Sequence, residues 1–290
     1  MVNLYSLVKN SSHFRKMEID GLLFVEYKCV MEETRFGVWS DNNYFAYILS
    51  GRKMWKSVSR DYDVYPGDIL FIKKGANLTQ QFFEDEFCAI FLFLPDDFVR
   101  SFLQKHPQFM AEATSQPLNP EPVLRIPPDE LLESYFSSVA SYLSLSKKPN
   151  EQLLKLKFEE LLLQVCTSAH HQPLKDYFVS LTHPEGHQLS YVMEANYAYN
   201  LKLVDFAQLC YLSLSSFKRL FKQQYKTSPA AWILHRKLEL ALKLLATTDL
   251  AVSQISLQCG FEDTSHFIRV FKKKHKITPH QYRLQQRQLS

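Results

Sequence analysis

The chain has 290 residues, enough for two domains of ordinary size, each with its own hydrophobic core. Hydrophobic residues make up 46% and charged residues 22%, which excludes a disordered chain, and the low counts of 7 glycines and 13 prolines exclude collagen-like and low-complexity chains. No apolar run approaches the roughly 18 residues of a membrane span, and the first ten residues do not resemble a signal peptide. We therefore expect a cytoplasmic protein that does not cross a membrane.

The formal net charge of +4 is distributed unevenly along the chain. Residues 189–290 contain 15 Lys and Arg against 6 Asp and Glu, whereas residues 1–188 contain 19 against 24. A basic C-terminal third on a slightly acidic body suggests a module that binds a polyanion. A solvated lysine-rich surface would give the same count. The charge count alone therefore does not establish such a module, and a sequence motif is needed as well.

The region from Leu22 to Leu94 is predicted to form short strands. Apolar runs such as 69–72 and 87–94 are bounded by turn signals, for example Pro66-Gly67-Asp68. Short strands with closely spaced turns indicate a β-barrel or a sandwich.

Two helices are expected after the strands. Asp129 and Asn150 are good N-caps, and apolar residues follow each of them at helical spacing. The apolar stripe of the second helix is wider than one buried face requires. The excess can pack on the barrel or join two chains. We favour the dimer contact, formed by Leu154, Phe158, Leu161 and Val165. The following segment, 171–188, is rich in histidine, proline and glycine and is predicted to be a linker.

The C-terminal third contains an internal duplication. Identical residues recur 50 positions apart: Ser215, Phe217, Arg219, Phe221, Lys222, Lys226 and Pro229 return as Ser265, Phe267, Arg269, Phe271, Lys272, Lys276 and Pro279. Each copy has a short helix (203–209 and 252–258), a tight turn and a second helix. This is the plan of a helix-turn-helix unit.

The second helix of each copy has two distinct faces. The aromatic residues share one side and are expected to be buried, whereas the other side carries a small polar residue followed by long hydrogen-bond donors. Such a face suits a helix that enters the major groove of DNA, and its recurrence argues against an ordinary surface helix. A rigid helix over 231–245 could hold the two recognition helices about one DNA turn, roughly 34 Å, apart.

These residues resemble the AraC/XylS family of bacterial transcription regulators. The resemblance covers 189–290 and is strongest in Gly260-Phe261, in 265–272 and in Thr278-Pro279. It implies seven helices with two helix-turn-helix units. It also implies base-edge contacts from Ser215, Lys218 and Arg219, and from Thr264, Ser265, Ile268 and Arg269. Lys222 and Lys272 are the implied phosphate contacts.

The N-terminal part is less specific. Ser50-Gly51 and 66–72 look like the cupin-type barrel found in many members of this family, yet no histidine occurs between Gly37 and Leu94 to serve as a metal ligand. The five cysteines include no C-x-x-C pair. We therefore expect no catalytic centre, metal or cofactor. Segments 68–75 and 91–103 also resemble family members that activate type III secretion genes, which protein partners regulate.

The sequence thus predicts an α+β protein, with an N-terminal cupin-like β-barrel bearing two helices and a C-terminal all-α domain bearing two helix-turn-helix units. The expected domains are a sensory and dimerisation domain (1–170), a linker (171–188) and a DNA-binding domain (189–290). We expect a transcription regulator, most simply an activator, that forms a homodimer and has duplex DNA and RNA polymerase as partners. A small molecule or a protein would control it. The alternative is an adaptor that binds a partner and uses DNA only as an anchor.

Overall fold

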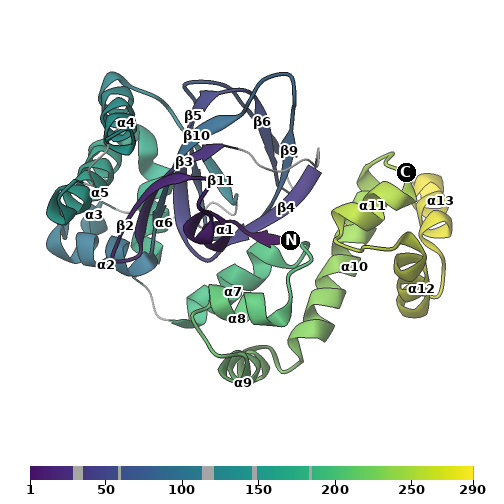
Figure 1. Cartoon of the computed structure of the whole chain (residues 1–290). Helices are drawn as coiled ribbons and strands as arrows, with labels where there is room; N and C mark the ends of the chain where they lie inside the picture. Colours follow the sequence, from purple (N-terminus) through teal and green to yellow (C-terminus); the bar gives the residue numbers. More distant parts are fainter. Residues whose placement is uncertain (29–34, 58–59, 113–120, 146–148, 183–184, 290) are drawn as a thin grey trace. The chain divides into compact units, whose positions relative to one another are not determined.

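The computed structural model describes residues 1–28, 35–57, 60–112, 121–145, 149–182 and 185–289 (Figure 1). The chain divides into two compact units, Met1–Gln188 and Leu189–Ser290, called here the N-terminal and C-terminal units. No helix in the described part of the chain is long and apolar enough to cross a membrane.

Two β-sheets form the centre of the N-terminal unit. The first has the strand order β1 (Val2–Asn3), β4 (Arg35–Ser40), β9 (Gly75–Gln81), β6 (Lys53–Lys56) and β7 (Asp61–Val64). The second has the order β11 (Val123–Ile126), β8 (Ile69–Ile72), β5 (Asn43–Ser50), β10 (Cys88–Leu94), β3 (Leu22–Lys28) and β2 (Arg15–Ile19). Neighbouring strands are antiparallel except for β1 and β4. Because both sheets contribute to one hydrophobic core, the predicted barrel takes the form of a sandwich of two separate sheets in the described part of the chain.

Strand β10 shows why the sequence pattern there is continuously apolar. Each of its seven residues is buried, because one face lies in the core between the sheets and helices cover the other face of its sheet. The two predicted helices are part of that cover. They are α4 (Glu130–Leu143) and α5 (Glu151–Thr167), and their caps Asp129 and Asn150 accept hydrogen bonds from the first turns as expected. The unit also contains α1 (Leu4–Asn10), α2 (Asp96–Lys105), α3 (Gln108–Ala111), a 3₁₀ turn (Ala169–His171) and α6 (Gln172–Ser180).

The predicted dimer contact on α5 is wrong in its placement. All four side chains of that stripe are at most 1% exposed within a single chain: Leu154, Phe158, Leu161 and Val165. The ring of Phe158 lies 4.3 Å from that of Phe24 on β3, between centroids, so this face packs on the sandwich. The alternative that the sequence left open is therefore the observed one. The apolar residues that α5 leaves exposed are Leu153, Leu156 and Leu163.

Most of the segment predicted as a linker belongs to the N-terminal unit. Helix α6 buries Leu174, Tyr177 and Phe178, and the Phe178 ring meets that of Phe71 with centroids 5.3 Å apart. These three residues have helical spacing, but histidines and prolines around them obscured the pattern. Pro173 lies in the first turn of α6, where its missing N–H has no consequence.

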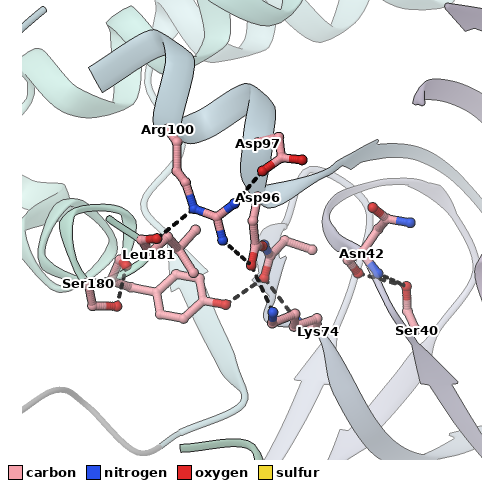
Figure 2. Close-up of polar contacts among 10 residues, drawn as sticks. Ser40, Asn42, Lys74, Asp96, Asp97, Arg100, Ser180 and Leu181 are labelled. Carbon is pink, nitrogen blue, oxygen red and sulfur yellow. Dashed lines mark hydrogen bonds and ion pairs between the residues drawn. The ribbon is translucent and has the colours of Figure 1, made fainter. Parts of the chain in front are cut away.

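A buried polar network fixes α6 to the sandwich (Figure 2). The Nζ of Lys74 and the carboxylate of Asp96 are 2.7 Å apart, and each side chain is 1% exposed. Asn43 donates to Asp96 over 2.8 Å and accepts from the Tyr177 hydroxyl over 2.7 Å. Arg100 donates through Nε to the carbonyl of Leu181, the residue that ends α6. Helix α6 is thus held in place by side chains from distant parts of the sequence.

The C-terminal unit is entirely helical in its described part. Its helices are α7 (Glu185–Asn196), which begins just before the unit boundary, α8 (Leu203–Leu209), α9 (Leu214–Tyr225), α10 (Pro229–Thr247), α11 (Val252–Gln258), α12 (Thr264–His275) and α13 (Pro279–Leu289). Helix α10 contacts α9, α11 and α13, and Leu238 and Ala241 of α10 share a core with Phe267 and Phe271 of α12. The unit therefore consists of two helix-turn-helix units, α8–α9 and α11–α12, built around one central helix.

Candidate DNA-binding surface

Helix α9 begins and ends as a well-defined recognition helix would. The Ser213 hydroxyl accepts a hydrogen bond from the backbone N–H of Ser216, which satisfies one of the free donors at the N-terminus. Phe217 and Phe221 are fully buried, so the rotation of the helix is fixed. Lys226 ends the helix in the left-handed conformation, with φ of 57°.

Helix α12 repeats this arrangement with a different cap. The Asp263 carboxylate accepts from the backbone N–H groups of Ser265 at 2.9 Å and His266 at 3.0 Å. These two hydrogen bonds hold the pKa of Asp263 below its ordinary value. Phe267 and Phe271 are fully buried, as their counterparts in α9 are. Both second helices thus present the same opposite face outward.

The predicted DNA contacts mostly occupy this outward face. Seven of the nine side chains belong to exposed residues: Ser215, Lys218, Arg219, Lys222, Ser265, Arg269 and Lys272. Thr264 and Ile268 are only half-exposed. Part of the Ile268 side chain packs against the core around α10 and α12. The reason is that its position lies at the border between the polar and apolar faces.

Several exposed basic residues on this surface were not singled out from the sequence. Lys273 and Lys274 are exposed in the last turn of α12, beside Lys272. His266 is exposed in its first turn. The run of three lysines was a usable signal, although it lacks a counterpart in the first copy.

The turns of the two units differ by one residue. The N–H of Leu212 bonds the carbonyl of Ala207 in the first turn, and the N–H of Phe261 bonds that of Ser256 in the second. The hydrogen bond of the second turn lies 49 residues after that of the first, whereas the helix cap Asp263 lies 50 residues after Ser213. The second turn therefore has one more residue between its hydrogen bond and its helix cap. The left-handed position is occupied by Tyr211, with φ of 55°, in the first turn and by Gly260, with φ of 74°, in the second.

Gly260 lies where the second unit meets the loop that precedes the first unit. A Cβ added there would be 2.1 Å from the carbonyl oxygen of Ala198, in the loop between α7 and α8. Lys237 of α10 donates to the carbonyl of Gly260 at 2.7 Å and to the Asn200 side chain at 3.3 Å. Burial lowers the pKa of Lys237 below its ordinary value. Lys237 therefore connects the central helix both to the second turn and to the loop that precedes the first unit.

The neighbouring Arg236 ties α10 to α7. Its guanidinium pairs with Glu194 of α7 and with Glu239 of α10, each at 2.7 Å, and lies over the rings of Tyr197 and Trp232. The contacts of Arg236 and Lys237 thus hold α10 in place against its neighbours.

No group of three or more potential metal ligands lies together among the described residues. The fold and this surface together define a DNA-binding regulator with two helix-turn-helix units in its C-terminal unit and a β-sandwich in its N-terminal unit. In both of its units the chain resembles the AraC/XylS family of transcription regulators. Residues 43–177 match the ExsA N-terminal regulatory domain, and residues 206–285 match a helix-turn-helix domain. The family consists of regulators, not enzymes.

Several relatives match over most of their length. The virulence regulon transcriptional activator VirF of Yersinia enterocolitica is 28% identical over 237 residues, covering 82% of this chain and 87% of VirF. The regulator ExsA of Pseudomonas aeruginosa is 25% identical over 232 residues, covering 80% of this chain and 82% of ExsA. Among solved structures, apo ToxT K231A from Vibrio cholerae aligns with a TM-score of 0.43 and 16% identity, covering 92% of this chain and 98% of ToxT.

Proposed function

We propose that the protein activates transcription by placing α9 and α12 in two successive major-groove segments of one DNA site. The observation that carries this proposal is the recurrence of one exposed, basic face on two capped helices of a single unit. Helix α10 has 19 residues and is about 28 Å long, close to the roughly 34 Å of one DNA turn. The similar protein VirF is a virulence regulon transcriptional activator, which favours activation over repression here.

The outward residues divide into two roles in this proposal. Near the N-terminus of each helix, Ser215 and Ser265 are small enough to let the backbone approach the base edges. One turn later, Arg219 and Arg269 carry planar forks that match the O6 and N7 atoms of guanine. Lys222 and Lys272 lie further along, where a phosphate is the nearer partner.

Replacing Arg269 or Lys272 with alanine is expected to separate base reading from phosphate contact. Arg269→Ala should cost about 1–3 kcal/mol of binding free energy on the preferred site and flatten the preference at one base pair. Lys272→Ala should weaken good and poor sites equally and reduce the salt slope of binding by about one unit, because one fewer phosphate is neutralised. Both are measured by titrating the full chain against all single-base variants of its site.

Each variant is the control for the other, since both side chains are exposed on the same helix. A uniform loss of affinity for Arg269→Ala, with no base position relaxed, would show that this arginine contacts phosphate. If neither variant changes DNA affinity, α12 is not a recognition helix.

We assign the control of this activity to the N-terminal unit, through a small molecule or a protein partner, with RNA polymerase as the partner at the promoter. The site of action is the cytoplasm, where bacterial DNA lies. We also propose that the protein acts as a homodimer through the exposed leucines of α5: Leu153, Leu156 and Leu163. Because the inner stripe of that helix is occupied by the sandwich, only this outer face is left for a second copy.

Leu156→Glu is expected to convert the dimer to monomers, because it places a charge in the apolar contact. Leu156 is 57% exposed, so the fold of the single chain should not change. The measurement is sedimentation equilibrium, with Leu78→Glu as a matched control, since Leu78 is exposed on β9 of the other sheet. An unchanged dimer in Leu156→Glu, or a monomeric parent protein, would rule out this contact.

A further inference from the structure

The two recognition helices end in the same uncommon way. Lys226 follows α9 and Lys276 follows α12, and both residues have left-handed backbone, with φ of 57° and 68°. Each backbone N–H donates to the carbonyl of the lysine four residues earlier, at 3.0 Å to Lys222 and at 2.8 Å to Lys272. The residue at this position after a helix is usually glycine, because left-handed backbone disfavours a Cβ. The chain therefore bears a conformational cost at both positions.

Glycine does occur at another left-handed position of the same unit. It is Gly260, in the turn of the second helix-turn-helix unit. The last turns of the two recognition helices have also diverged, since 223–224 are glutamines in α9 and 273–274 are lysines in α12. Lys226 and Lys276 are nevertheless identical. The backbone alone would favour glycine, so the reason for lysine at both positions lies in its side chain.

Both side chains are exposed and have no partner within the described part of the chain. No ion pair or side-chain hydrogen bond joins Lys226 or Lys276 to another described residue. Each lies one helical turn from another exposed lysine, Lys222 or Lys272, and like charges at this spacing repel. The partial negative charge at the helix end attracts a cation, but those two lysines in the last turns already meet it. The charges of Lys226 and Lys276 are therefore suited to a partner outside the protein.

The length of each helix places its final lysine at the edge of a DNA groove. Lys226 follows Ser215 by 11 residues, and Lys276 follows Ser265 by the same number. This spacing corresponds to about 16 Å along a helix, whereas the major groove is about 12 Å wide. A helix whose N-terminal serine approaches the base edges therefore ends beside the phosphates that border the groove.

We propose that Lys226 and Lys276 are a matched pair of phosphate contacts, one at the end of each recognition helix, and that lysine takes the place of glycine there for its charge. The partner is the phosphodiester backbone of duplex DNA, which is contacted without regard to base sequence. This assignment rests on the proposed placement of α9 and α12 on DNA. Replacement by glycine then relieves the backbone and weakens DNA binding, a combination that a lysine with only a structural role would not give.

The test compares the full chain with Lys226→Gly, Lys276→Gly and the double variant. The probe is a mixed-sequence duplex of about 30 base pairs, titrated by fluorescence anisotropy between about 50 and 200 mM salt. Each single variant should lower affinity about 5- to 10-fold at about 0.1 M salt and reduce the slope of log affinity against log salt by about one. The double variant should reduce the slope by about two. Hydrogen exchange of α9 and α12 should be no faster than in the parent, since glycine accepts left-handed backbone.

Two further variants are controls. Lys226→Arg combined with Lys276→Arg keeps both charges and should retain the salt slope of the parent. Lys243→Gln removes one charge from an exposed position of α10, on the side away from its buried residues, and should change the slope less than either glycine variant does.

The assignment is supported if the slope falls by about one per lysine, exchange of the helices is not accelerated, and the arginine variant behaves as the parent does. Unchanged slopes in the glycine variants of a parent that binds DNA overturn this assignment alone and leave the proposed placement of α9 and α12 untouched. A fall no larger than that of Lys243→Gln, or one accompanied by faster exchange, also overturns it, because net charge or the helix end would then explain the loss. A parent whose affinity does not depend on salt overturns both the assignment and the proposed function.

Discussion

Gly260→Ala is expected to lower the free energy of unfolding of the C-terminal unit by on the order of 2–5 kcal/mol. The left-handed backbone at Gly260, with φ of 74°, costs a residue with a Cβ about 1–2 kcal/mol. The Cβ would also lie 2.1 Å from the carbonyl oxygen of Ala198, and a backbone atom cannot rotate away as a side chain can. That overlap adds about 1–3 kcal/mol. Hydrogen exchange of the full chain, followed by mass spectrometry, measures the two units separately.

Gly67→Ala is the matched control for this variant. Gly67 also has positive φ, 90°, but a Cβ there would meet no atom within 4 Å. The free energy of unfolding of Gly67→Ala should therefore fall only by the conformational cost of about 1–2 kcal/mol, and the change should appear in the N-terminal unit. Equal losses for the two variants would contradict the close approach of Gly260 to Ala198.

Asp96→Ala is expected to destabilise the N-terminal unit by about 3–5 kcal/mol. The change leaves the Lys74 ammonium buried without the carboxylate that lies 2.7 Å from it, and Asn43 loses its acceptor. A urea titration followed by the indole N–H signals of Trp55 and Trp232 would separate the units, because these tryptophans lie in different ones.

Asp97 provides the control, because it is the next residue, pairs with Arg100 and is 89% exposed. Asp97→Ala should cost no more than about 0.5 kcal/mol, as expected of a solvent-exposed ion pair. The double variant Lys74→Met with Asp96→Leu should recover much of the loss, since an apolar pair replaces the buried charges. A double variant less stable than Asp96→Ala would mean that the ion pair is not the source of the effect.

The parts predicted well from sequence are those governed by local patterns. The helices 203–209 and 252–258 have the predicted bounds, and the caps Asp129 and Asn150 make the expected bonds. Caps and apolar spacing are properties of residues a few positions apart, and the duplication is visible as identical residues at one fixed offset, so the sequence itself displays all three.

The parts predicted poorly depend on contacts between distant residues. Nothing near α5 indicates that Phe158 meets Phe24, so the apolar stripe could not be assigned to the core or to a second chain. Likewise, the attachment of α6 depends on Tyr177 reaching Asn43, 134 residues away. Lys237 looks like one more DNA contact until its bond to Gly260 is seen.

The two helix-turn-helix units are no longer interchangeable copies. The turn of the second unit has Gly260 at its left-handed position, where a Cβ would lie 2.1 Å from the carbonyl oxygen of Ala198 in the loop that precedes the first unit. The turn of the first unit has Tyr211 at the equivalent position, and this residue is 52% exposed. Close approach of a backbone therefore requires glycine in the second turn but not in the first, so the duplication has become directional.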